Sequence, residues 1–150
     1  AGEVDAAGLY QPHGSAAMRL LGDKGLVFAA PRLYTATMNL VAKPGLSDPD
    51  AVKLLRALQR ATAFIRTDPP RAQALVASQL KLDSKVVSET WELLSFRLSL
   101  GQSLLTTMEA QSRWMRRTGQ VKGDLSPDFL ARMRPGPLRA LDPTAVTLVD

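Results

Sequence analysis

The chain has 150 residues, of which 45% are hydrophobic and 22% charged, and its formal net charge at pH 7 is +5. This composition is typical of a folded globular domain and excludes a largely disordered chain. The absence of cysteine, together with a single histidine (His13), excludes disulfides, cysteine nucleophiles, thiolate metal sites and any site with two histidine ligands.

The first third of the chain predicts a mixture of strands and helix. Residues 4–10 and 26–30 are short apolar runs that suit buried strands. Residues 12–21 predict a helix that Gly22 ends, as a glycine at a helix C-terminus commonly does. Threonine and valine in residues 35–42 favour a further extended segment. This order of elements predicts an α/β fold.

Three aspartates mark the starts of the helices that follow. Asp48 and Asp68 each precede a proline, and Asp83 precedes a third apolar-periodic segment, so each is a predicted N-cap. The apolar faces of these three helices are expected to be buried. Their residues are Leu54, Leu55, Leu58, Thr62 and Ile65; Ala72, Leu75, Val76 and Leu80; and Val86, Val87, Thr90, Trp91 and Leu94.

A fourth long helix is predicted in the last third of the chain. Ser99 and Gln102 have the spacing of a capping box, and Gly119 ends the helix. Residues 146–149 predict a terminal strand or an extended anchor. We expect the helices between about residues 48 and 118 to pack on a small sheet built around residues 35–42. The aromatic residues expected in the core are Phe64, Trp91, Phe96 and Trp114.

Basic residues concentrate late in the sequence, at Arg113, Arg116, Arg117, Lys122, Arg132, Arg134 and Arg139. Such a cluster is a nucleic-acid footprint, a solvated surface or a docking face for an acidic partner. No aromatic residues interleave with these arginines as a platform for single-stranded nucleic acid requires. We therefore expect no nucleic-acid partner.

Several segments together resemble one known family. Residues 10–12 read Tyr-Gln-Pro where that family usually has Trp-Glu-Pro, and residues 33–41 are similar to its return strand. Residues 63–69, 80–83, 96–100 and 113–114 and the ending 142–148 follow the same order and spacing. The chain thus resembles the C-terminal half of the solute-binding proteins of nitrate, sulfonate and taurine ABC importers. These are type II periplasmic binding proteins, related to the thiamine-pyrimidine synthase-like family.

The resemblance implies a two-lobed protein with a ligand cleft between the lobes. Residues 1–30 would end the second lobe, residues 31–34 would be a hinge crossing, and residues 35–150 would return to the first lobe with the C-terminal helices. Closure about such hinges is a standard way of trapping a ligand.

The predicted ligand-binding residues are Tyr10, Gln11, His13 and Thr35. Tyr10 and Gln11 lie between a predicted strand and a helix N-terminus, which offers free N–H groups and suits an anion. The alternative is that they only pack or cap at the helix start. For His13 the alternative, a partly exposed helix residue, is favoured over a ligand or hinge contact. For Thr35 a hydroxyl contact to ligand competes with ordinary strand propensity.

The expected function is capture of a small solute for an ABC importer, without catalysis, metal or cofactor. Gln11 replaces the usual glutamate, and a neutral amide favours an anionic or neutral ligand such as nitrate or a sulfonate. Resemblance implies an ABC permease as partner and a periplasmic location, although the sequence shows no signal peptide. Thiamine-pyrimidine synthase chemistry is discounted because it relies on cysteines and histidines that are absent here.

The resemblance to half of a binding protein also bears on how this chain associates. The strand at residues 35–42 would lack its partners from the N-terminal half, so its edge and the leucine stripes would be exposed. We therefore expect a homo-oligomer, formed by strand pairing or by exchange of an element. The alternative functions are a basic protein- or nucleic-acid-interaction module and a truncated fragment without independent activity.

Overall fold

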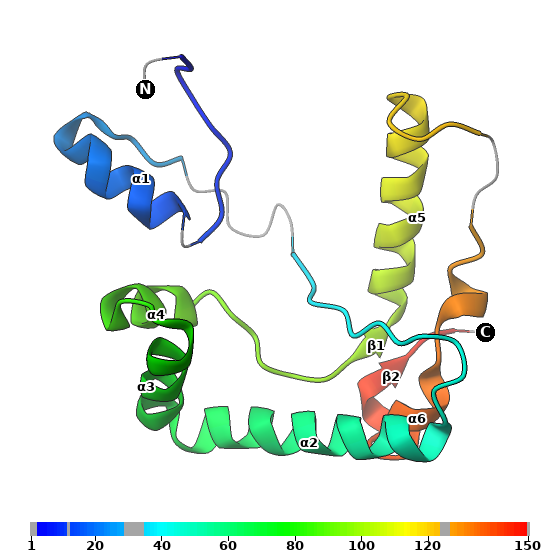
Figure 1. Cartoon of the computed structure of the whole chain (residues 1–150). Coiled ribbons are helices and arrows are strands. Elements are labelled where there is room, and N and C mark those ends of the chain that lie inside the picture. The colour runs from blue at the N-terminus through cyan, green and yellow to red at the C-terminus, as the bar shows by residue number, and fades with distance from the viewer. Residues whose placement is uncertain (1–2, 12, 29–34, 124–126, 150) are drawn as a thin grey trace. The chain divides into compact units, whose positions relative to one another are not determined.

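The computed structural model describes residues 3–11, 13–28, 35–123 and 127–149. The chain forms two units, one of residues 1–36 and 64–96 and the other of residues 37–63 and 97–150. The described residues are mainly helical and include a two-stranded parallel sheet, an arrangement compatible with the α/β class (Figure 1). The predicted hinge crossing at residues 31–34 lies outside the described residues.

The first unit contains three helices that begin and end near the predicted residues. Helix α1 spans His13–Leu21, and Gly22, with φ of +54°, starts a short 3-10 turn that ends at Lys24. Helices α3 (Pro69–Leu80) and α4 (Ser84–Trp91) pack against each other (Figure 1). A positive φ is favourable for glycine because it has no Cβ, which explains why the first helix ends where the sequence predicted.

The aspartate caps are confirmed for two of the three helices. The Asp68 side chain accepts a hydrogen bond from the Arg71 backbone N–H at 3.2 Å, and the Asp83 side chain accepts one from the Lys85 N–H at 2.7 Å. Both bonds satisfy N–H groups that have no partner inside the helix.

The predicted cap of the longest helix is wrong by one residue. Helix α2 spans Asp48–Thr67, and the hydroxyl oxygen of Ser47 accepts a hydrogen bond from the Asp50 N–H at 3.3 Å. The Ser47 hydroxyl donates to the Asp50 carboxylate at 2.7 Å. Ser47 and Asp50 thus form the pair that closes the helix start, and the Asp48 carboxylate contacts Arg134 instead.

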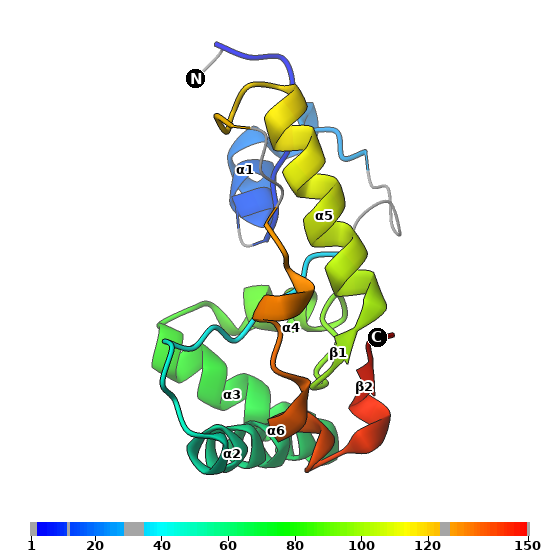
Figure 2. The same ribbon diagram turned by 90° about the vertical axis from the view of Figure 1, so that its right-hand side faces the viewer.

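The second unit contains the sheet. Strand β1 (Leu100–Gly101) pairs in parallel with β2 (Val146–Thr147), so that Leu100 is opposite Val146 and Gly101 is opposite Thr147. Figure 2 shows the two strands side by side, with α5 (Gln102–Arg117) continuing directly from β1. Parallel strands need a long connection, and α5 supplies its first part.

The rest of that connection is made of short elements. It contains the 3-10 turn Leu130–Arg132, helix α6 (Pro135–Arg139) and the 3-10 turn Pro143–Ala145. Gly119, with φ of +72°, lies just beyond the end of α5, as predicted, and its N–H donates to the Arg116 carbonyl at 3.0 Å.

The predicted capping box at Ser99 and Gln102 is wrong. The N-cap of α5 is Gly101, and a glycine has no side chain that could accept a capping hydrogen bond. The reason is that residues 100–101 belong to β1, so the helix begins only at Gln102. The side-chain carbonyl of Gln102 accepts a hydrogen bond from the Val149 N–H at 3.2 Å, which ties the start of α5 to the end of β2.

The prediction of a sheet around residues 35–42 is also wrong. These residues are exposed and belong to no strand, and residues 4–10 and 26–28 likewise form no strand. A strand exists only where another strand satisfies its backbone groups, and within the described residues none pairs with these segments. The predicted terminal strand is confirmed for residues 146–147.

Burial is sparse in both units. Among the described residues, the buried apolar ones are Ala72, Val86 and Val87 in the first unit and Leu105, Pro137 and Leu138 in the second. The expectation for α2 is therefore wrong, because none of its described residues is buried and Leu54 is 44% exposed.

The aromatic residues divide between packed and exposed. Trp91 packs on Phe96 with ring centroids 4.7 Å apart, and the Arg71 guanidinium lies 5.8 Å from the Phe64 ring centroid. Trp114 was expected in the core and is instead 47% exposed.

Candidate functional site

The predicted site begins at the N-terminus of α1, where the backbone N–H groups are already used. The carbonyl of Tyr10 accepts hydrogen bonds from the His13 N–H at 3.0 Å and the Gly14 N–H at 3.2 Å. The side-chain carbonyl of Gln11 accepts one from the Ser15 N–H at 3.0 Å. The expectation that this helix start offers free N–H groups to an anion is therefore wrong for these three donors.

Gln11 is the capping residue of this helix start. Its side-chain oxygen accepts a second hydrogen bond, from the Ser15 hydroxyl, at 2.8 Å. The Ser15 backbone N–H can only donate, so its contact with Gln11 identifies which end of the side-chain amide is the oxygen and which is the NH₂. Among the described residues the Gln11 NH₂ has no hydrogen-bond acceptor, so it is the group that remains able to donate to a ligand.

Two aromatic rings from residues close to Gln11 in the sequence contact each other. The rings of Tyr10 and His13 meet edge to face, with centroids 5.7 Å apart and planes at 81°. Tyr10 is 79% exposed and His13 is also exposed. The exposure of His13 agrees with its interpretation as a surface residue of the first helical turn. Together the amide, the phenol and the imidazole offer polar groups to solvent on a short stretch of chain.

Thr35 is exposed and makes no hydrogen bond with any residue that the structure describes. The contacts that are present bring Tyr10, Gln11 and His13 together at α1 and do not include Thr35. A shared cleft that contains all four residues therefore stays a prediction.

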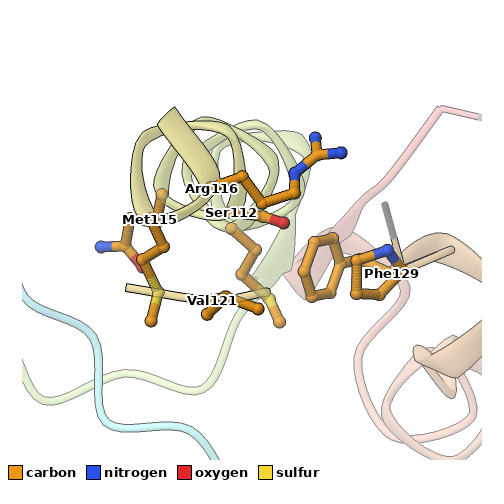
Figure 3. Close-up of a pocket in the computed structure, with 8 residues that line it drawn as sticks. Ser112, Met115, Arg116, Val121 and Phe129 are labelled. Carbon is orange, nitrogen blue, oxygen red and sulfur yellow. The ribbon is translucent and has the colours of Figure 1, made fainter. Parts of the chain in front are cut away.

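A hollow that the sequence did not predict lies beside α5. It is a cavity of about 330 Å³, lined by Met108, Gln111, Ser112, Met115, Arg116, Val121, Pro127 and Phe129. Figure 3 shows Met115, Ser112 and Arg116 on the helix, with Val121 and Phe129 facing them from the chain that follows. The spacing of Met108, Ser112 and Met115 could have suggested a helix face, but nothing periodic marks the opposite wall. Its walls are mainly apolar side chains.

Among the described residues, two carboxyl groups have a lowered pKa, and both occur at turns and helix starts. A hydrogen bond from the Ser47 hydroxyl, assisted by Lys53, lowers the pKa of Asp50, and a hydrogen bond from the Thr144 hydroxyl lowers that of Asp142. In each case the bond favours the ionised carboxylate. These shifts are explained by local capping and do not indicate a catalytic pair. Nor do the described residues contain three His, Asp or Glu side chains grouped to hold a metal ion.

Comparison with known proteins adds no relative from which function could be transferred. No family model, no curated protein and no solved structure matches this chain. Within the described part of the chain, no helix has both the length and the apolar character to cross a membrane.

Proposed function

We propose that this chain is part of the solute-binding component of an ABC importer and captures a small anionic or neutral solute, such as nitrate or a sulfonate. The proposal includes a type II periplasmic binding fold with a cleft between two lobes, a permease partner and a periplasmic location. Its basis is the resemblance at residues 10–12, 33–41 and the later segments. The observation that supports the ligand class is the hydrogen bonding of Gln11.

The chemistry of Gln11 favours an acceptor ligand. Its carbonyl accepts two hydrogen bonds from Ser15, whereas the two N–H donors of the amide have no acceptor among the described residues. The neighbouring Tyr10 hydroxyl can also donate. Nitrate and sulfonate oxygens accept hydrogen bonds, whereas an ammonium group needs an acceptor or a negative charge. This arrangement therefore suits an oxyanion or a neutral carbonyl compound better than an amine.

The sharpest variant is Gln11→Glu. A glutamate can still accept from the Ser15 N–H and hydroxyl, so the start of α1 is kept, while the NH₂ donor becomes a carboxylate oxygen. We expect nitrate or methanesulfonate to shift the Gln11 side-chain NH₂ resonances and the Tyr10 ring resonances in NMR titrations. Gln11→Glu should abolish the anion-dependent shifts of Tyr10.

Ethylammonium chloride and sodium chloride at equal ionic strength serve as controls for charge and salt. Binding of ethylammonium in preference to the two oxyanions would contradict the assignment of ligand class. The absence of any shift at Gln11 and Tyr10 with all probes would contradict the assignment of the site.

A second candidate function, binding of single-stranded nucleic acid, is favoured by one observation. The expectation that no aromatic residue interleaves with the arginines is wrong at the end of α5, where Trp114 is 47% exposed between the exposed Arg113 and Arg117. Bases stack on exposed aromatic rings while arginines contact phosphates. Arg113 also lies 3.9 Å from the Glu109 carboxylate, which competes with a phosphate.

The fluorescence of Trp114 tests this candidate in a Trp91→Phe background. Binding of an oligothymidylate should quench the emission, and rising salt should reverse the quenching. Binding releases counterions from the phosphates, and this release is less favourable at higher salt. The variant Arg117→Ala should weaken binding, whereas Lys85→Ala on α4 is a matched control for charge. Emission that is unchanged by the oligonucleotide at low salt would rule this candidate out.

A further inference from the structure

Residues 37–42 form an exposed segment whose backbone hydrogen-bonding groups have no partner within the described residues (Figure 1). The segment leads to the turn before α2, where the first backbone hydrogen bond joins the Leu46 N–H to the Lys43 carbonyl at 3.4 Å. Met38, Leu40 and Val41 are 95%, 58% and 84% exposed. Another strand could pair with this segment, because it would supply hydrogen-bond partners for the backbone and cover the exposed apolar side chains.

The side chains of this segment alternate in the manner of a half-buried strand. In an extended conformation Met38, Leu40 and Ala42 lie on one face, which is wholly apolar. Thr37, Asn39 and Val41 lie on the other face, which is mostly polar. Residues 37–42 contain no charged side chain that would oppose pairing with another strand, and the first charged residue after them is Lys43.

We propose that residues 37–41 pair with the same residues of a second copy of this chain, as an antiparallel two-stranded ribbon with Asn39 on the two-fold axis. In this register Thr37 is opposite Val41 of the other copy, and Met38 is opposite Leu40. Two Met38–Leu40 pairs then lie together on the apolar face. The pairing supplies partners for backbone groups that have none among the described residues of one chain.

The alternation is compatible with antiparallel pairing of the segment with itself, and it restricts the register. Directly opposed residues of antiparallel strands lie on the same face, and a shift by one residue would mix polar and apolar side chains on both faces. Registers centred on Asn39, Met38 or Leu40 keep the faces separate. Centring on Met38 pairs fewer of residues 37–41, and centring on Leu40 brings Lys43 opposite Thr37. The segment is thus complementary to itself about Asn39.

The contact is expected to be weak and concentration-dependent, because a two-stranded ribbon is marginally stable in water. This inference does not rest on the proposed solute binding, because it uses only the pattern and exposure of residues 37–42. The two can fail separately, since one is read by chemical shifts at Gln11 and Tyr10 and the other by cross-linking.

Cysteine cross-linking tests the register, and the absence of native cysteine makes each introduced thiol unique. Opposed residues of an antiparallel ribbon have Cα atoms about 4.5–5.5 Å apart, within the range that a disulfide spans. We expect Asn39→Cys to form a covalent dimer on mild oxidation. A mixture of Thr37→Cys and Val41→Cys should give the mixed dimer, while each alone should give much less. Ser88→Cys, exposed on α4, is the control for random collision.

Three results would overturn the proposal. Cross-linking of Asn39→Cys no faster than Ser88→Cys would exclude this contact. Efficient self-cross-linking of Thr37→Cys would indicate parallel pairing in its place. If Leu40→Lys associates as strongly as the native chain, measured by light scattering at equal concentration, any dimer forms through another surface. Leu20→Lys is the matched control, because Leu20 is also exposed and lies outside the proposed contact.

Discussion

The guanidinium of Arg134 donates a hydrogen bond to the carboxylate of Asp48, which lies 86 residues earlier in the chain. Asp48 is the first residue of α2, and Arg134 is the N-cap residue of α6. The pair therefore connects the starts of two helices of the second unit. Both side chains are largely exposed, at 66% for Asp48 and 43% for Arg134, so water screens their attraction.

We expect this ion pair to contribute little to global stability. In a double-mutant cycle of Asp48→Asn and Arg134→Gln, the coupling in the free energy of unfolding should be about 0.2–1 kcal/mol at low salt. Raising the salt concentration should reduce it, because screening weakens exposed pairs. Urea unfolding at two salt concentrations measures both. A larger coupling that is insensitive to salt would show that water is excluded from the pair.

The pairing of β1 with β2 requires glycine at residue 101. A Cβ added to Gly101 would lie 2.7 Å from the Thr147 hydroxyl oxygen, although its φ of −121° suits any residue. Gly101→Ala should therefore destabilise the protein by about 1–3 kcal/mol, the usual cost of overpacking. Thr147→Ala removes the obstructing oxygen and should recover most of the loss. If the double variant is no more stable than Gly101→Ala alone, the close approach is not the reason for the glycine.

Leu105 anchors α5 in the second unit and is 5% exposed. Leu105→Ala should lower the free energy of unfolding by about 2–5 kcal/mol, since it removes buried methyl groups and leaves a cavity. Leu20→Ala on α1 is the matched control, because Leu20 is 89% exposed and its loss should cost little. Chemical denaturation followed by the fluorescence of Trp114 in the Trp91→Phe background measures the first variant, and circular dichroism compares the two. Equal effects would contradict the burial of Leu105.

Asp142 is expected to make stability depend on pH through Thr144. Because its folded-state pKa lies below the ordinary value of 3.8, the native state favours the ionised carboxylate. This contribution is fully present above the unfolded-state pKa and is lost as the pH falls through the lowered value. Thr144→Val should raise the pKa of Asp142 towards 3.8, and Thr144→Ser should leave it low.

An NMR titration of the Asp142 carboxyl carbon measures these pKa values directly. The stability difference between the native chain and Thr144→Val should be present at neutral pH and decline as the pH falls through the lowered pKa of Asp142. It should vanish at a lower pH, where the carboxyl is protonated in both the folded and the unfolded state. A difference that persists at the lower pH would mean that Thr144 acts through packing and not through the carboxylate.

The sequence alone determined the features that depend on a few neighbouring residues. The caps at Asp68 and Asp83 and the helix ends at Gly22 and Gly119 were predicted because a capping side chain or a positive φ acts within one helical turn. The capping role of Gln11, one of the two alternatives for that residue, is equally local.

Tertiary structure decided the features that depend on residues far apart in the sequence. Residues 100–101 became a strand because residues 146–147 pair with them, and this pairing removed the capping box predicted at Ser99. Residues 35–42 have strand composition, but no described strand lies beside them to satisfy their backbone. Periodicity placed Trp114 on the apolar face of a helix, yet its exposure depends on whether other parts of the chain pack against that face. A strand needs a second strand to pair with, and a buried side chain needs neighbours that cover it. A local sequence pattern identifies the segment itself but not the distant residues that pair with it or cover it.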